Sequence, residues 1–150
     1  MAKEIVVEVQ VAPLFDGLVE VERLERAVRA TLQHVERPGE VTVVITDDEG
    51  ILELNRDFMD QDEPTDVLSF PAQEDGGPFI AAPGSDLYLG DVVISYTRAV
   101  DQAFEQEYPV ERELDLLVVH GVLHLLGYDH AEREERDEMW ACQDEILAGL

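Results

Sequence analysis

Cysteine is nearly absent from this 150-residue sequence, which contains only Cys142. A single cysteine excludes an internal disulfide and is typical of a reducing compartment, so we expect a cytoplasmic location. Long hydrophobic runs are absent too, and no stretch reaches the roughly 20 apolar residues that a membrane-spanning helix needs. The first residues, Met1 to Glu4, contain no basic region followed by an apolar one and give no sign of a signal peptide. We therefore expect no membrane partner.

Basic residues are also scarce. The chain has ten lysines and arginines against 35 acidic residues, which gives a formal net charge of −25. Such a surface keeps a protein soluble but repels nucleic acid, which usually binds to basic surfaces. Arg23, Arg26 and Arg29 recur at every third position of one predicted helix. Their spacing fits a stripe that contacts phosphates, but such stripes are more often solvated helix faces paired with neighbouring acidic residues.

Hydrophobic periodicity predicts a single α+β domain that spans residues 1–150. Runs rich in β-branched residues predict strands, and apolar stripes with a period of 3.6 residues predict helices. The predicted strands are residues 4–11, 40–46, 67–71 and 87–95, and the predicted helices are residues 20–35, 47–58, 96–108, 110–126 and 131–149. Because strands and helices do not alternate strictly, we expect a small mixed sheet of about four strands packed with about five helices.

Single residues refine this expectation. Pro71 ends one predicted strand, which suits a strand at the edge of the sheet. Gly90 lies inside another strand and indicates a bulge or a close backbone contact. In the helix that follows that strand, we expect Val100, Ala103 and Phe104 to point inward.

Three of the four histidines lie within eleven residues, at positions 120, 124 and 130. The helix that carries the first two is apolar nearly all round, so we expect it to be buried at the centre of the domain. His120 and His124 are four residues apart and share one face of this helix. Gly127 favours a left-handed helix end that can bring His130 back toward them. Three imidazoles leave the fourth position of Zn²⁺ for water, so we predict one zinc ion on these histidines.

The same spacing occurs in the metalloprotease motif HExxHxxGxxH, except that Gly121 replaces the glutamate that acts there as general base. A peptidase would therefore lack the group that deprotonates the zinc-bound water. The missing side chain of Gly121 either leaves room beside the metal or allows close helix packing, and the sequence fits both. Histidines with a purely structural role are the alternative to a metal site, because two histidines four residues apart occur on many helices by chance.

Three motifs carry a family resemblance. They are His-Gly-Val-Leu-His-Leu-Leu-Gly-Tyr-Asp-His at 120–130, Pro-Thr-Asp-Val-Leu-Ser-Phe-Pro at 64–71 and Leu-Gly-Asp-Val-Val-Ile-Ser at 89–95. In sequence, order and spacing they resemble the YbeY family of bacterial endoribonucleases and rRNA maturation factors. The resemblance implies a zinc-dependent endoribonuclease, specific for single strands, that acts in 16S rRNA 3′-end maturation and ribosome quality control. It implies rRNA and the ribosome as partners, with ribosomal or ribosome-associated proteins, and places the family's zinc ligands on His120, His124 and His130.

The catalytic residues stay unknown at this point. Many family members have an arginine directly after the aromatic residue that follows the pair Leu54-Asn55, but this chain has Met59 there. The nearest arginine is Arg56, earlier on the same predicted helix, and the family role is not transferred to it. RNA cleavage can also use the substrate's own 2′-hydroxyl as nucleophile, which would make the missing glutamate unimportant.

Three aspartates close to these motifs are alternative candidates. We expect Asp129 to cap or turn the chain after the helix, with the orientation of a ligand imidazole as its alternative role. Asp66 and Asp91 are expected to be turn and strand-end residues rather than bases.

Two other functions fit the same histidines. One is a zinc hydrolase that acts on a peptide or another amide. The other is a ribosome-associated binding module in which zinc is structural and contributes to folding.

Overall fold

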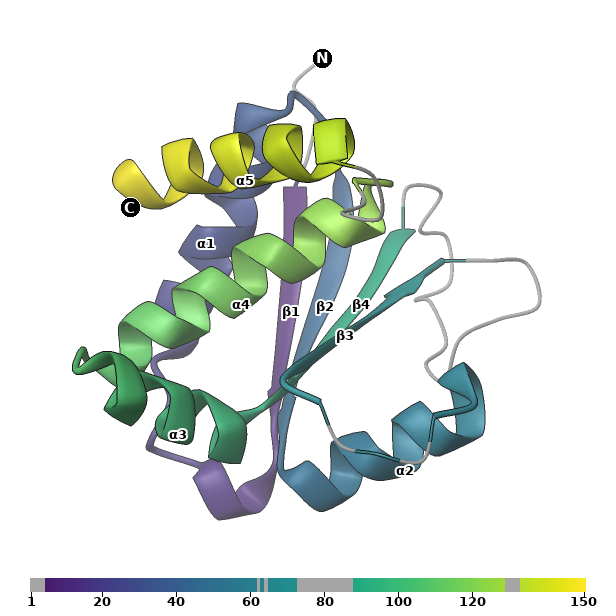
Figure 1. Cartoon of the computed structure of the whole chain (residues 1–150), viewed down its shortest axis with the longest axis vertical. Helices are drawn as coiled ribbons and strands as arrows, with labels where there is room; N and C mark the ends of the chain where they lie inside the picture. The colour runs from purple at the N-terminus through teal and green to yellow at the C-terminus, as the bar shows by residue number, and fades with distance from the viewer. Residues whose placement is uncertain (1–4, 62, 64, 73–87, 129–132) are drawn as a thin grey trace.

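The computed structural model describes residues 5–61, 63, 65–72, 88–128 and 133–150. This part of the chain forms four strands and five α-helices, with one short 3-10 helix, as Figure 1 shows. In chain order they are β1 (Ile5–Val11), η1 (Pro13–Phe15), α1 (Val21–His34), β2 (Gly39–Thr46), α2 (Asp48–Met59), β3 (Val67–Pro71), β4 (Tyr88–Ser95), α3 (Tyr96–Gln106), α4 (Val110–Leu125) and α5 (Arg133–Ala148). The predicted α+β class is confirmed, and each predicted element is present within a few residues of its expected bounds.

The four strands form one mixed sheet in the order β1-β2-β4-β3. β1 pairs in parallel with β2, and β2 in parallel with β4, whereas β3 is antiparallel to β4. In the described part of the chain, β3 is thus an edge strand, as Pro71 predicted.

Gly90 marks an irregularity between the two central strands. The register of β2 against β4 shifts between Glu40 and Val41, which pair with Tyr88 and Gly90. Gly90 has a φ of +140°, and a Cβ atom there would lie 2.4 Å from the backbone oxygen of Phe70. Both the predicted bulge and the predicted close backbone contact are confirmed.

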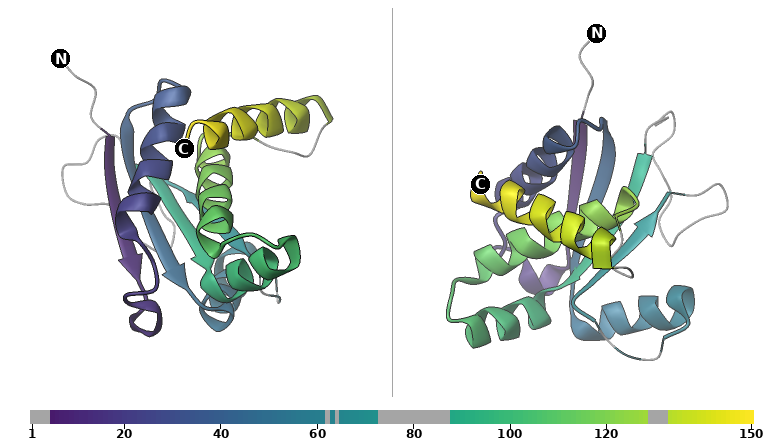
Figure 2. Two further views of the ribbon diagram at one scale, coloured as in Figure 1. Left: turned by 90° about the vertical axis from the view of Figure 1, so that its left-hand side faces the viewer. Right: turned by 45° about the horizontal axis from the view of Figure 1, so that its top comes forward.

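Helices cover the two faces of the sheet unequally. α1 lies along β1, while α4 packs on β3 and β4 on the same face, and α5 crosses over α4 (Figures 1 and 2). This face holds the main hydrophobic core, in which Val43, Ile94 and Val118 are fully buried. On the opposite face, α2 covers a smaller apolar cluster around Ile51 and Val93. None of the described helices is long and apolar enough to cross a membrane.

The predicted inward face of α3 is wrong for two of its three residues. Val100 is 42% exposed and Phe104 is 84% exposed, while Ala103 is buried as expected and Ala99 is buried beside it. The reason is the direct junction with β4, because Ser95 ends the strand and its side chain caps the helix. This junction fixes how α3 is rotated against the sheet, and two small alanines then face inward instead of the larger apolar residues.

Candidate metal centre

The structure brings His120 and His124 together on the exposed side of α4. Their ring centroids are 4.7 Å apart, with an angle of 68° between the ring planes. Both residues are partly buried, whereas most of their neighbours on α4 are buried against the sheet and the other helices. The two imidazoles therefore form a pair that is accessible from one side.

α4 ends in the way that Gly127 predicted. Gly127 has a φ of +98° and donates its N–H to the carbonyl of His124 at 3.0 Å, and Tyr128 donates to the carbonyl of Leu123 at 3.1 Å. These two bonds are those of a Schellman motif, which turns the chain sharply away from the helix axis. The next two residues, Asp129 and His130, lie outside the described residues. No group of three or more metal-binding side chains occurs within the described ranges. Of the three predicted ligands, the described residues include His120 and His124.

A cleft of about 410 Å³ lies between the edge strand β3 and the histidine face of α4. One side is lined by β3 and the two residues before it, and the other side by the two histidines: Thr65, Asp66, Val67, Leu68, Ser69, Pro71, His120 and His124. Strand residues and imidazoles thus face the same space, and its lining includes the first and the last residue of β3.

Gly121 holds β3, β4 and α4 close together. A Cβ atom at this position would lie 2.5 Å from Cγ1 of Val92 and 3.3 Å from Cγ2 of Val67. The carbonyl of Gly121 accepts a hydrogen bond of 2.8 Å from the hydroxyl of Ser69. Of the two explanations that the sequence left open, close packing is therefore the one that the structure supports. A glutamate at position 121 would run into Val92, so this helix position supplies no base to the cleft.

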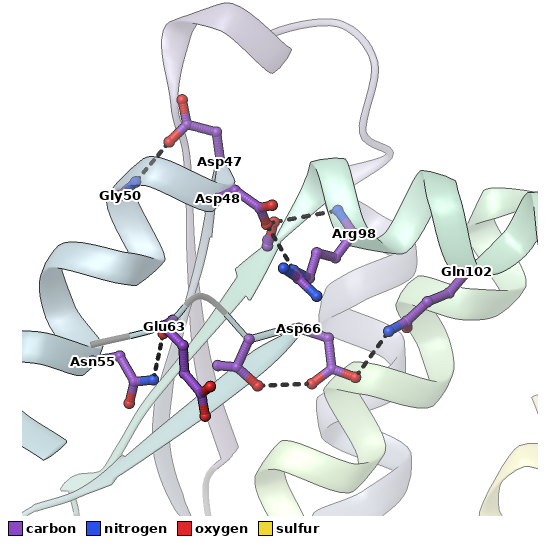
Figure 3. A network of polar contacts seen from close by, with 10 residues as sticks. Asp47, Asp48, Gly50, Asn55, Glu63, Asp66, Arg98 and Gln102 are labelled. Carbon is purple, nitrogen blue, oxygen red and sulfur yellow. Dashed lines mark hydrogen bonds and ion pairs between the residues drawn. The ribbon is translucent and has the colours of Figure 1, made fainter. Parts of the chain in front are cut away.

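Asp66 forms one end of the cleft and is held in place by its neighbours. Its carboxylate accepts hydrogen bonds of 3.4 Å from the side chains of Thr65 and Gln102 (Figure 3). Its backbone oxygen accepts one of 2.9 Å from the N–H of Ser95. These contacts tie the start of β3 to α3. Asp66 acts as a turn residue, as expected, with a carboxylate at the edge of the cleft.

The same network joins the start of α2 to the start of α3. The carboxylate of Asp48 accepts hydrogen bonds from Ser95 at 2.8 Å and from Arg98 at 3.1 Å, while Asp47 caps α2 by accepting from the N–H of Gly50 at 2.8 Å (Figure 3). Arg98 is thus engaged in the fold. No arginine or lysine occurs among the described residues that line the cleft.

Two of the three arginines in the stripe on α1 form contacts within the protein. Arg23 forms an ion pair with the buried Asp115 at 2.8 Å, and this hydrogen bond raises the pKa of the guanidinium further. Arg29 donates to the carbonyl of Ile5 at 2.8 Å. Internal contacts, rather than a phosphate-contacting stripe, thus account for two of the three arginines.

Two carboxyl groups are buried elsewhere. Asp91 is 2% exposed and accepts a hydrogen bond from the hydroxyl of Tyr88, and burial raises the pKa of this carboxyl. It lies within β4 rather than at a strand end, opposite Thr42 on β2. Burial also raises the pKa of Glu113, which accepts from Tyr108. Neither carboxyl lines the histidine cleft, so the structure offers neither as a base for chemistry there.

Sequence reasoning missed Gln143 on α5. Its side-chain oxygen Oε1 lies 3.1 Å from Nδ1 of His120. The sequence signal was weak, because Gln143 belongs to none of the three motifs. Gln143 lies four residues after the buried Met139 and three before the buried Ile146, so helical spacing places it on the packed face.

These features define an α+β protein with a histidine-lined cleft between an edge strand and a central helix. The family model described as Endoribonuclease YbeY matches residues 15–150. A relative from Roseiflexus sp. (strain RS-1), named Endoribonuclease YbeY, is 48% identical over 96% of this chain and 92% of its own length. A Bacillus cereus (strain G9842) relative of the same name is 46% identical over 84% of this chain and 81% of its own.

A solved structure shares the fold as well. The solution structure of a protein from Thermotoga maritima is similar to this chain with a TM-score of 0.57 and 31% identity, covering 95% of this chain and 86% of its own. The chain belongs to the YbeY family of endoribonucleases.

Proposed function

We propose that this protein is a zinc-dependent endoribonuclease that cleaves single-stranded RNA and acts in 16S rRNA 3′-end maturation and ribosome quality control. The endoribonuclease part rests on the family, since the curated relatives carry the name Endoribonuclease YbeY. The observation that supports a cleavage site in this chain is the pair of imidazoles that faces the cleft beside β3.

The chemistry of these side chains fits zinc. Neutral imidazoles are preferred ligands of Zn²⁺, and His120 and His124 present two of them on one side of α4. We propose His130 as the third ligand, with one zinc ion per chain. A zinc ion held by these residues would supply a Lewis acid and would lower the pKa of a bound water.

The chain's own residues shape the approach of the substrate. The cleft lies along β3, and its volume of about 410 Å³ suits a single extended RNA strand better than an RNA duplex. Gly121 contributes no carboxylate, and Val92 blocks the space that such a side chain would need. We therefore propose that the 2′-hydroxyl of the RNA is the nucleophile. Asp66 is the lining residue that carries a carboxylate at the edge of the cleft.

The acidic surface limits how RNA can be held. With a net charge of −25 and no basic residue among the described cleft lining, the chain offers little to bind phosphates tightly. We propose that rRNA is presented by the ribosome in the cytoplasm, with ribosomal or ribosome-associated proteins as partners.

Cleavage of a labelled single-stranded RNA in the presence of zinc tests this function. His124→Ala should abolish cleavage, whereas His34→Ala should retain it, because His34 lies on α1 and contacts Glu145 at 3.2 Å. An RNA with a single 2′-deoxy nucleotide at the cut site should resist cleavage at that position. Equal activity of the two histidine variants would contradict the proposal, and hydrolysis of peptides without cleavage of RNA would favour the amide-hydrolase alternative.

A further inference from the structure

A neutral amide on α5 contacts the histidine pair. Oε1 of Gln143 lies 3.1 Å from Nδ1 of His120. An amide oxygen can only accept a hydrogen bond, so Nδ1 must carry the proton in this arrangement. Nε2 of the same ring then keeps its lone pair.

This tautomer is the one that metal binding through Nε2 requires. A histidine ligand usually donates its other ring N–H to a carboxylate, carbonyl or water, which fixes both the tautomer and the orientation of the ring. A free histidine side chain prefers the opposite tautomer, with the proton on Nε2. Without an acceptor beside Nδ1, His120 would have to change tautomer before it could bind a metal through Nε2.

From this geometry we infer that Gln143 is a positioning residue, which holds His120 in the tautomer and orientation that expose Nε2 to a metal ion. The inference rests on the proposed metal site. In addition to packing on α4, α5 therefore holds His120 in its metal-binding tautomer in the metal-free protein.

Other contacts of α5 separate this role from a structural one. Met139 is fully buried and Ile146 is 4% exposed, and both anchor α5 in the main core. Glu145 makes a further contact with His34 on α1 at 3.2 Å. Because these contacts do not involve Gln143, we expect Gln143→Leu to fold and to keep α5 in place.

The first readout is the tautomer of His120 in the metal-free protein, at a pH where the imidazole is neutral. Long-range ¹H–¹⁵N correlation spectra distinguish a proton on Nδ1 from one on Nε2. We expect the Nδ1–H form in the wild type, conversion toward the Nε2–H form in Gln143→Leu, and retention of the Nδ1–H form in Gln143→Glu, whose carboxylate also accepts. An Nε2–H form in the wild type would overturn the inference.

The second readout is zinc affinity, measured by competition with a chelating dye. Loss of an outer hydrogen-bond partner typically weakens metal binding about 10- to 100-fold, and we expect a loss in this range for Gln143→Leu with restored affinity in Gln143→Glu. Gln33→Leu, the same change at an exposed position on α1, should bind zinc like the wild type. If the wild type binds zinc and Gln143→Leu binds it equally well, the inference fails while the proposed function stands. If the wild type binds no zinc, both fail.

Discussion

Replacement of Gly121 by alanine has two opposing effects on stability. Alanine is more favourable than glycine inside a helix by about 1 kcal/mol, which alone would stabilise the protein. Against this, the new Cβ atom would lie 2.5 Å from Cγ1 of Val92 and 3.3 Å from Cγ2 of Val67. The shorter distance is about 1 Å below an ordinary carbon–carbon contact. Val92 is fully buried, and valine side chains are stiff, so α4 and the sheet must separate.

Overpacking of this kind typically costs about 1–3 kcal/mol, and contact with two stiff side chains puts this site toward the upper end. After the gain in helix propensity, we expect Gly121→Ala to lower the free energy of unfolding by about 1–2 kcal/mol. The lower melting temperature should be visible by circular dichroism, and urea titration gives the free energy.

A double-mutant cycle identifies the cause. Combined with Val92→Ala, which removes the nearest methyl group, Gly121→Ala should cost less than it does alone, with a coupling of about 1 kcal/mol or more. Gly149→Ala is the control, because its Cβ would make only ordinary contacts of 3.6 and 3.9 Å. A stabilised Gly121→Ala protein, or no coupling to Val92, would refute the close packing of α4 on the sheet.

Three further predictions follow from single contacts. Ser69→Ala should lower the free energy of unfolding by about 1 kcal/mol in urea titration, because the carbonyl of Gly121 loses its 2.8 Å hydrogen bond; unchanged stability would show that the bond is unimportant. Arg23→Met should cost about 1–3 kcal/mol, since it leaves the buried carboxylate of Asp115 without its ion pair, whereas Arg26→Met at an exposed position should change little. Burial raises the pKa of Asp91, so the folded state holds this proton to higher pH than the unfolded state does. Wild-type stability relative to Asp91→Asn should therefore fall as the pH rises from about 3.9 through the raised pKa, and a difference independent of pH between 4 and 8 would contradict this.

Much of the architecture could be predicted because local signals and tertiary packing agree. The alternating pattern of the strands set their bounds, and Pro71 placed β3 at an edge since proline cannot donate to a further strand. Gly90 and Gly127 were informative because each adopts a positive φ that other residues avoid.

The remainder depends on how elements are oriented against one another. Apolar content suggested the wrong face of α3, because the junction at Ser95 sets its rotation and leaves Phe104 exposed. The contact between Gln143 and His120 joins residues 23 positions apart, and no sequence spacing encodes it. The sequence could not distinguish whether Gly121 leaves room beside the metal or allows close packing. The position of Val92 supports close packing.

Zinc content measured by mass spectrometry on untagged protein tests the central proposal most directly. We expect about one zinc ion per chain in the wild type and in His34→Ala, and loss of zinc in His124→Ala with an unchanged circular dichroism spectrum. A wild-type protein that holds no zinc after the metal is supplied, or a His124→Ala protein that holds as much as the wild type, would contradict the metal site in the cleft between β3 and α4.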